Sequence, residues 1–205
     1  METVKIALFG KMRSGKNTVA DMMKAKEAFE EFSFGEGIGN IIDMYFPTAR
    51  ANGKPRQHYQ TIGQALRQLD KDVWVNYTLA SIHKYEEWCR QAERDAFVVI
   101  ADGRQLNEAE RLREEGFIIV KVECDEEERL RRIQAENDAF DPSQLNHETE
   151  LQVDQVRADF VIRNDYGLKE LETQVDVLLA IAYLSQLRGG DLSHAVVKLG
   201  VGIYG

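Results

Sequence analysis

The apolar residues of the chain fall into short continuous runs that alternate with longer stretches of helical spacing. Short apolar runs are typical of strands, whereas apolar residues three and four positions apart indicate helices that bury one face. The predicted strands are 4–9, 31–35, 97–101, 117–122 and 160–163. The predicted helices are 16–28, 38–45, 59–94 with a break near 70–72, 105–115, one that begins at Asp125, 147–157 and 168–187.

This alternation predicts an α/β fold, with about five parallel strands flanked by helices, because parallel strands need crossover connections. Strand 4–9 should lie at the centre of the sheet. The polar segments 49–58 and 137–147 predict loops. The tail 192–205 has no assigned role, and both an extra strand and a self-association surface stay open.

The first predicted strand runs directly into a glycine-containing loop. Gly10 and Gly15 lie five residues apart and Lys16 follows at once, which is the spacing of a phosphate-binding P-loop. The glycines let backbone N–H groups point at phosphate oxygens, and Lys16 adds a cation near the terminal phosphates. Asn17 stands where a Ser or Thr usually binds Mg²⁺, and Thr18 comes one residue later. An Asn17 carboxamide oxygen would still suit Mg²⁺. We therefore expect a nucleoside triphosphate here.

Length and charge set limits on the partners of the protein. The 205 residues suit one domain, so we expect a single domain over 1–205. A net charge of −9 disfavours nucleic acid polymers and anionic membranes, which leaves small molecules as the expected partners. We expect no signal peptide, and the sequence has no apolar run near the ~20 residues of a membrane span. Two cysteines without metal-ligand spacing fit reduced thiols, so we expect a cytoplasmic protein.

Four further segments join the P-loop in a resemblance to one family. The chain resembles the phage-type deoxynucleoside monophosphate kinases, within the wider group of P-loop nucleoside monophosphate kinases. The similar segments are Gly10–Ala20, Phe32–Phe34, Gly63–Arg67 with Asp72–Asn76, Ala101–Arg104 with Asn107–Ala109, and His147–Glu150. The resemblance covers residues 4 to 185. It implies a P-loop kinase fold with a small lid over about 129–147 and an acceptor-binding helical region over about 36–94.

The resemblance also implies which residues bind the acceptor. They are Arg67, Trp74, Asp102, Arg104 and Asn107. An arginine fork matches the geometry of a phosphate group, so Arg67 and Arg104 are expected on the acceptor phosphate. Asp102 would hold the Mg²⁺ water shell together with Asn17, or fix Arg104 and the acceptor. The alternatives are a solvated helix face for Arg67, a cap on the helix that begins near Gln105 for Asp102, and first-turn polarity for Asn107.

The donor side is assigned in the same way. The residues expected to bind ATP are Gly10, Arg13, Ser14, Gly15, Lys16, Asn17, Thr18 and Asn164. Asn164 follows the last strand, where such kinases contact the donor base, although a plain turn residue explains it equally well.

The expected catalytic residues are Lys16 and two lid arginines, Arg129 and Arg132, which share one helix face. The pairs Asp125–Arg129, Glu127–Arg131 and Glu128–Arg132 would also explain these arginines without a ligand.

The sequence therefore predicts transfer of the ATP γ-phosphoryl group, with Mg²⁺, to a (deoxy)nucleoside monophosphate. Another small-molecule kinase, such as one acting on dephospho-coenzyme A, and a non-catalytic nucleotide-binding module are the alternatives. The tail 189–205 stays unassigned, and a homodimer stays open. The histidines show no metal-ligand spacing.

Overall fold

The computed structural model describes residues 2–51, 53–135 and 148–187. Within them five parallel strands form one sheet in the order β2-β3-β1-β4-β5. The strands are β1 (Thr3–Phe9), β2 (Glu30–Phe32), β3 (Ala96–Gly103), β4 (Ile118–Glu123) and β5 (Phe160–Arg163). The predicted α/β fold is confirmed, with β1 as the middle strand. The predicted loop 137–147 and the tail 189–205 lie outside the described residues, as does most of the expected lid.

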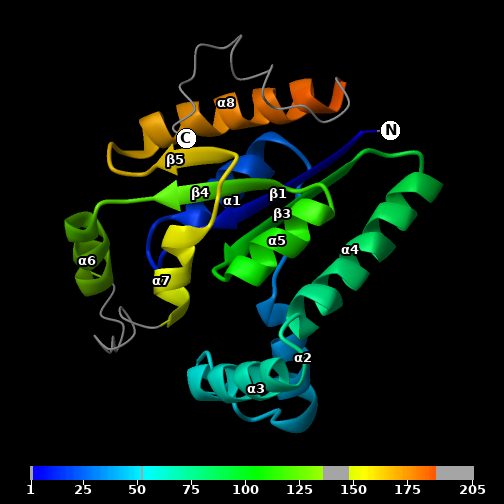
Figure 1. The fold of residues 1–205 in the computed structure, drawn as a ribbon, viewed down its shortest axis with the longest axis vertical. Helices are drawn as coiled ribbons and strands as arrows, with labels where there is room; N and C mark the ends of the chain where they lie inside the picture. Colours follow the sequence, from blue (N-terminus) through cyan, green and yellow to red (C-terminus); the bar gives the residue numbers. More distant parts are fainter. Residues whose placement is uncertain (1, 52, 136–147, 188–205) are drawn as a thin grey trace.

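Helices cover both faces of this sheet. They are α1 (Lys16–Lys26), α2 (Gly35–Tyr45), α3 (Arg56–Leu69), α4 (Val73–Gln91), α5 (Leu106–Glu114), α6 (Glu126–Ala135), α7 (Glu148–Gln155) and α8 (Leu168–Leu187). Helices α1 and α8 lie on one face, and α4 and α5 lie on the other (Figure 1). Helices α2 and α3 extend past the carboxyl end of the sheet, at the bottom of Figure 1.

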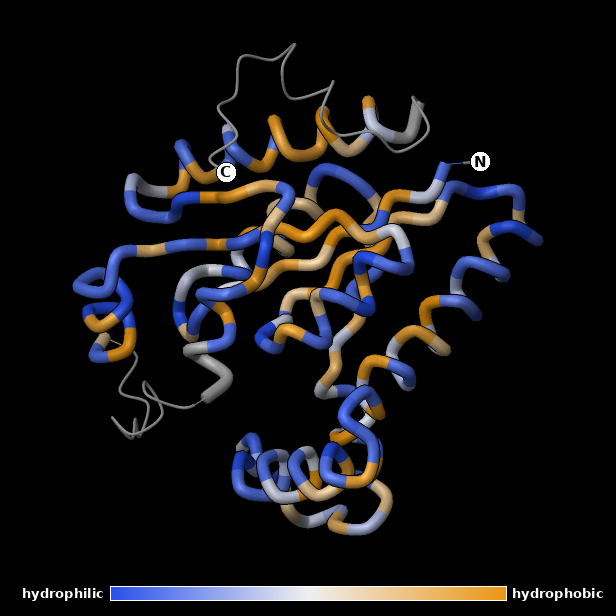
Figure 2. Tube along the Cα trace, in the orientation of Figure 1, coloured by the Kyte–Doolittle hydropathy of each residue, from blue (hydrophilic) through white to orange (hydrophobic). Residues whose placement is uncertain are grey.

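The central strand shows why the sheet is buried on both sides. Val4, Ile6 and Leu8 of β1 pack against α1 and α8, while Ala7 and Phe9 point to the other face, toward α2 and α4. This is the alternation of a strand whose successive side chains face opposite layers. Figure 2 shows the same result, since the most hydrophobic stretches lie in the strands between the two helix layers.

Several boundaries differ from the prediction by one to three residues, and the second strand and the third helix are two that border the cleft. The second strand ends at Phe32 rather than Gly35, because the backbone N–H groups of Phe34 and Gly35 bond to the Asp102 carboxylate instead of a neighbouring strand. Gly35 then begins α2. The third helix begins at Arg56, three residues before the predicted start, and the break near 70–72 is confirmed, since α3 ends at Leu69 and α4 begins at Val73.

None of the helices in the described ranges combines the length and the apolar character that crossing a membrane requires.

Candidate functional site

A large cleft opens at the carboxyl end of the sheet, where α/β proteins bind ligands. Its volume is about 1020 Å³, and its wall is built from the P-loop, β3, α3, the turn before α2 and the start of α8. Seven cationic and four acidic side chains line the described wall, so the cleft is positive in a chain of net charge −9. The cations are Arg13, Lys16, Lys54, Arg56, Arg67, Arg104 and Arg132.

We call the part around Arg13, Lys16 and Arg132 the P-loop end. Here β1 leads through the loop into α1, and the loop curls through left-handed backbone at Arg13 (φ 64°) and Gly15 (φ 103°). Lys16 is buried and folds back over the loop, where its Nζ donates to the carbonyl oxygens of Gly10 at 2.6 Å and Lys11 at 3.2 Å. Asn17 is exposed in the first turn of α1 and lines the cleft with Thr18.

Close packing holds the P-loop in this shape. A Cβ on Gly10 would lie 2.5 Å from the carbonyl oxygen of Val122 and 2.6 Å from Oγ of Ser14, so only glycine fits there. Asn164, at the end of β5, is buried and donates from Nδ2 to the Ser14 carbonyl oxygen at 2.9 Å. Asn164 therefore supports the loop from behind while it also lines the cleft.

Two arginines of helix α6 form hydrogen bonds to the P-loop backbone. Arg129 is buried, and its Nε donates to the Met12 carbonyl oxygen at 3.0 Å. Arg132 donates to the carbonyl oxygens of Asn164 at 3.0 Å and Arg13 at 3.5 Å, and it lines the cleft. The two predicted lid arginines are thus brought to the P-loop.

Of the three ion pairs that would explain the α6 arginines without a ligand, the contacts described for residues 126–135 include Glu128–Arg132. Glu128 pairs with Arg132 at 3.2 Å. Arg131 also pairs with Glu128, at 2.6 Å, rather than with Glu127. Asp125 pairs with Arg163 at 2.9 Å. The simple helix-surface account therefore does not explain Arg129, whose side chain turns inward to the P-loop.

The opposite part of the cleft, around Lys54, Arg56, Arg67 and Arg104, we call the α3 end. Lys54 and Arg56 flank Pro55 just before and at the start of α3, and Arg67 lies in the last turn of that helix. Arg104 follows β3. Sequence reasoning missed Lys54 and Arg56 because they lie in a polar loop that carries no motif.

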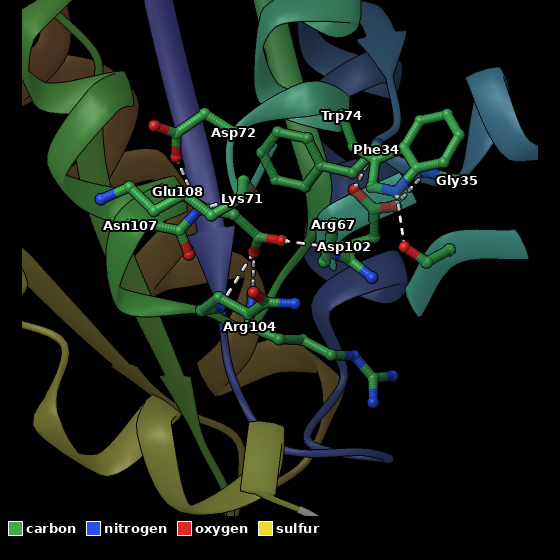
Figure 3. Close-up of polar contacts among 12 residues, drawn as sticks. Phe34, Gly35, Arg67, Lys71, Asp72, Trp74, Asp102, Arg104, Asn107 and Glu108 are labelled. Carbon is green, nitrogen blue, oxygen red and sulfur yellow. Dashed lines mark hydrogen bonds and ion pairs between the residues drawn. The ribbon is translucent and has the colours of Figure 1, made fainter. Parts of the chain in front are cut away.

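Asp102 shapes the α3 end from β3. Its carboxylate accepts hydrogen bonds from Ser33 Oγ at 2.7 Å and from the N–H groups of Phe34 and Gly35 at 3.1 Å each (Figure 3). It therefore caps α2. The alternative that Asp102 caps the helix near Gln105 is wrong, because Glu108 binds that helix start instead.

Glu108 is a carboxylate almost completely enclosed in the wall of the cleft, with 4% of its surface exposed. Its Oε2 accepts the N–H groups of Arg104 at 2.8 Å and Gln105 at 2.9 Å, and its Oε1 lies 3.7 Å from Nη2 of Arg67 (Figure 3). Burial raises the pKa of Glu108 to about 7, against the lowering effect of these two N–H groups.

Two expected acceptor residues do not line the described wall. Trp74 is 3% exposed, and its Nε1 donates to the Gly63 carbonyl oxygen at 3.1 Å, so it packs α4 against α3. Asn107 donates from Nδ2 to Asp72 Oδ1 at 2.8 Å and to the Lys71 carbonyl oxygen at 3.2 Å. It thereby ties α5 to the turn between α3 and α4 (Figure 3).

The side-chain oxygens of Asn17, Thr18 and Asp102 are the candidate metal ligands on the wall of the cleft. Among the residues that the structure describes, no group of three or more His, Cys, Asp or Glu side chains could hold a metal ion. Asp102 already accepts three hydrogen bonds, and Asn17 and Thr18 offer oxygens at the head of α1. This donor set suits a Mg²⁺ that gains most of its ligands from phosphates and water rather than from a protein cage.

Comparison with known proteins shows the fold. No protein-family model matches the chain, and no curated protein matches its sequence. A dephospho-CoA kinase from Campylobacter jejuni is 13% identical, with 90% of this chain and 100% of that chain covered and a TM-score of 0.54. A shikimate kinase from Acinetobacter baumannii is 17% identical (coverage 90% and 96%, TM-score 0.53), and a sugar kinase from a Janibacter species is 16% identical (91% and 97%, 0.51). The chain is therefore similar in fold to small P-loop kinases.

Proposed function

We propose that this chain transfers the γ-phosphoryl group of ATP to a (deoxy)nucleoside monophosphate. The observation that carries the proposal is a single cleft with cations at both ends, Lys16 and Arg132 at one and Arg56, Arg67 and Arg104 at the other. Transfer between two phosphorylated molecules needs cations on both of them, because the anions otherwise repel each other. Similarity in fold to small kinases agrees with this proposal.

Each end has a distinct task in this reaction. At the P-loop end the N-terminus of α1 and Lys16 bind the donor phosphates, and Lys16 exchanges its two carbonyl partners for phosphate oxygens. Arg132 is already fixed by the Arg13 and Asn164 carbonyl oxygens, so its guanidinium stays beside those phosphates. At the α3 end Arg67 and Arg104 hold the acceptor phosphate. The protein mainly positions charge, since phosphoryl transfer asks little covalent chemistry of it.

Mg²⁺ would enter with ATP and neutralise part of the charge on its phosphates. Asn17 and Thr18 are the residues that would face it from α1. Asp102 would take part only through an oxygen that also serves the start of α2.

The test is a panel of acceptors with ATP and Mg²⁺: dTMP, dGMP, dCMP, dAMP, modified deoxynucleoside monophosphates and dephospho-coenzyme A. We expect a diphosphate product from at least one monophosphate, measured by chromatography. Lys16→Ala should lower this turnover about 100-fold or more, as loss of a positioned cation does. Lys26→Ala is the matched control, because it lies in the last turn of α1 and pairs with Glu172 and Asp176. Phosphorylation of dephospho-coenzyme A alone would replace the acceptor class, and ATP binding without any transfer would favour a non-catalytic module.

A second variant addresses the non-catalytic alternative at the residue that raises it. Asn17→Ser restores the hydroxyl that P-loops usually place on Mg²⁺. If the chain is already an active kinase, turnover should change by less than about tenfold. A much larger gain would mean that Asn17 leaves the metal site impaired.

A further inference from the structure

Glu108 occupies an unusual place for an acid, since it lies in the wall of a cleft that otherwise gathers cations. Three groups surround its carboxylate. The backbone N–H groups of Arg104 and Gln105 donate to it, Arg67 of α3 faces it, and the charge of Asp102 on β3 acts on it. Asp102 acts on it as a like charge and Arg67 as an opposite one. Of the two carboxylate oxygens, Oε2 is held by two backbone N–H groups and Oε1 faces Arg67.

Bringing an acceptor phosphate to Arg67 would place a second anion beside this carboxylate. Two negative groups in a poorly solvated site cannot both stay ionised at low cost, so the weaker acid of the two takes a proton. A free phosphate monoester is close to dianionic at pH 8, because its second pKa is about 6. The buried carboxyl is therefore the group that changes.

We propose that Glu108 is a positioning residue that holds Arg67 in the empty cleft and releases it to the acceptor phosphate by taking up one proton from solvent. The carboxylate becomes a neutral carboxyl: Oε2 keeps both backbone N–H bonds, and Oε1 carries the new proton. No covalent bond other than this O–H bond forms or breaks, and the Arg67 guanidinium leaves Oε1 for the phosphate oxygens. This inference rests on the proposed function, because it requires a phosphate on the acceptor. A pKa of about 7 supports it, since the carboxyl then needs little further perturbation to become protonated near neutral pH.

The acceptor affinity should consequently depend on pH in a way that ATP affinity does not. Above pH 7 the empty site has an ionised Glu108, and binding of each acceptor must be accompanied by uptake of one proton from solvent. One linked proton weakens binding tenfold per pH unit. Glu108→Gln removes this linkage, because a neutral amide oxygen still accepts the Arg104 and Gln105 N–H groups but carries no charge.

The experiment uses the full-length protein and the monophosphate that gives the highest turnover in the panel. Its dissociation constant is measured by calorimetry from pH 7.5 to 8.5 in two buffers with different ionisation enthalpies, which also counts protons. The wild type should take up nearly one proton at pH 8 and lose about tenfold in affinity over this range. Glu108→Gln should take up none and show a flat profile. Glu110→Gln, exposed on the same helix, should behave as the wild type does.

The outcomes separate the two proposals. Turnover of a monophosphate together with no proton uptake in the wild type, or with the same pH profile in Glu108→Gln, overturns the role of Glu108 and leaves the kinase assignment standing. A wild type that neither binds nor phosphorylates any monophosphate overturns the kinase assignment and this inference with it. Because the readout is a pH slope and a proton count, a variant that is merely less stable cannot imitate the expected result.

Discussion

The two ends of the cleft hold their cations in different ways. At the P-loop end Lys16, Arg129 and Arg132 donate to backbone carbonyl oxygens of the loop and of Asn164, and Arg132 also pairs with the partly exposed Glu128 of its own helix. At the α3 end Arg67 faces the carboxylate of Glu108 instead. The P-loop end therefore holds its cations largely through neutral carbonyl groups, whereas the charge beside Arg67 depends on the proton of a buried carboxyl group.

This difference suits two ligands of different character. A triphosphate brings several negative charges and meets a loop whose cations are held mainly by backbone carbonyl oxygens. A monophosphate brings fewer charges to an arginine that is already partly neutralised. The comparison predicts that changes at the P-loop end abolish binding of the donor outright, while changes at the α3 end adjust the affinity for the acceptor.

The largest effect is expected from Gly10→Ala. The added Cβ would press on the Val122 carbonyl oxygen, which belongs to β4 and cannot move away, so the loop must distort. We expect loss of ATP binding by calorimetry and a fall of about 3 kcal/mol in the free energy of unfolding. Gly116→Ala is the matched control: its Cβ would meet nothing within 4 Å and its φ of 78° is strained, so it should cost only about 1 kcal/mol and leave ATP binding intact. Normal ATP affinity in Gly10→Ala would break the account of the P-loop end.

Next in size is the pH dependence of stability that Glu108 brings to the α3 end. Its folded-state pKa of about 7 lies above the ordinary value of 4.5. Between these values the folded state keeps a proton that the unfolded state releases, so the free energy of unfolding falls as pH rises and then levels off above pH 7. The fall amounts to about 3 kcal/mol. Denaturant titrations at several pH values should show this fall in the wild type and in Glu110→Gln but not in Glu108→Gln. The same dependence of the unfolding free energy on pH in all three proteins would mean that the Glu108 carboxyl is not buried as described.

Arg67→Ala should have a smaller and more selective effect. Loss of a charge-assisted contact to phosphate costs about 2 kcal/mol, which is roughly a 30-fold rise in the KM for the acceptor, with the KM for ATP unchanged. Steady-state kinetics with each substrate varied in turn give both values. Arg111→Ala, on α5 and paired with Glu114 and Glu115, should change neither. Equal weakening of both substrates would remove the distinction between the two ends.

How far the sequence predicts this molecule follows from the same comparison. The strands β1, β3, β4 and β5 were recognisable from apolar runs, and the P-loop from Gly10 to Thr18, because each is a continuous segment whose pattern is local. The α3 end brings together residues 54, 56, 67, 104 and 108, and no local rule joins them. Glu108 reads in sequence as an ordinary first-turn acid, and only its enclosure gives it a distinct pKa.

Trp74 shows the opposite case, since the resemblance placed it on the acceptor, whereas in the structure its side chain is buried and bonds to the Gly63 carbonyl oxygen of α3. Family motifs contain packing residues as well as ligand-binding ones, and the sequence alone does not separate them. Asp102 is a similar case, because its cap on α2 joins two segments 68 residues apart.

Trp74→Phe should therefore have the smallest effect. It removes the hydrogen bond to the Gly63 carbonyl oxygen and keeps the aromatic packing, so it should cost about 1 kcal/mol in the free energy of unfolding. The KM for the acceptor should stay within about twofold of the wild type. A tenfold rise in that KM with unchanged stability would return Trp74 to the acceptor site.

The central claim is that one cleft binds two phosphorylated molecules at once. An analogue that joins adenosine to the preferred deoxynucleoside through five phosphates spans both ends and tests it directly by calorimetry. We predict that it binds at least about tenfold more tightly than ATP or the monophosphate, and that Lys16→Ala and Arg67→Ala each weaken it. An affinity equal to that of ATP alone, unaffected by Arg67→Ala, would contradict the claim.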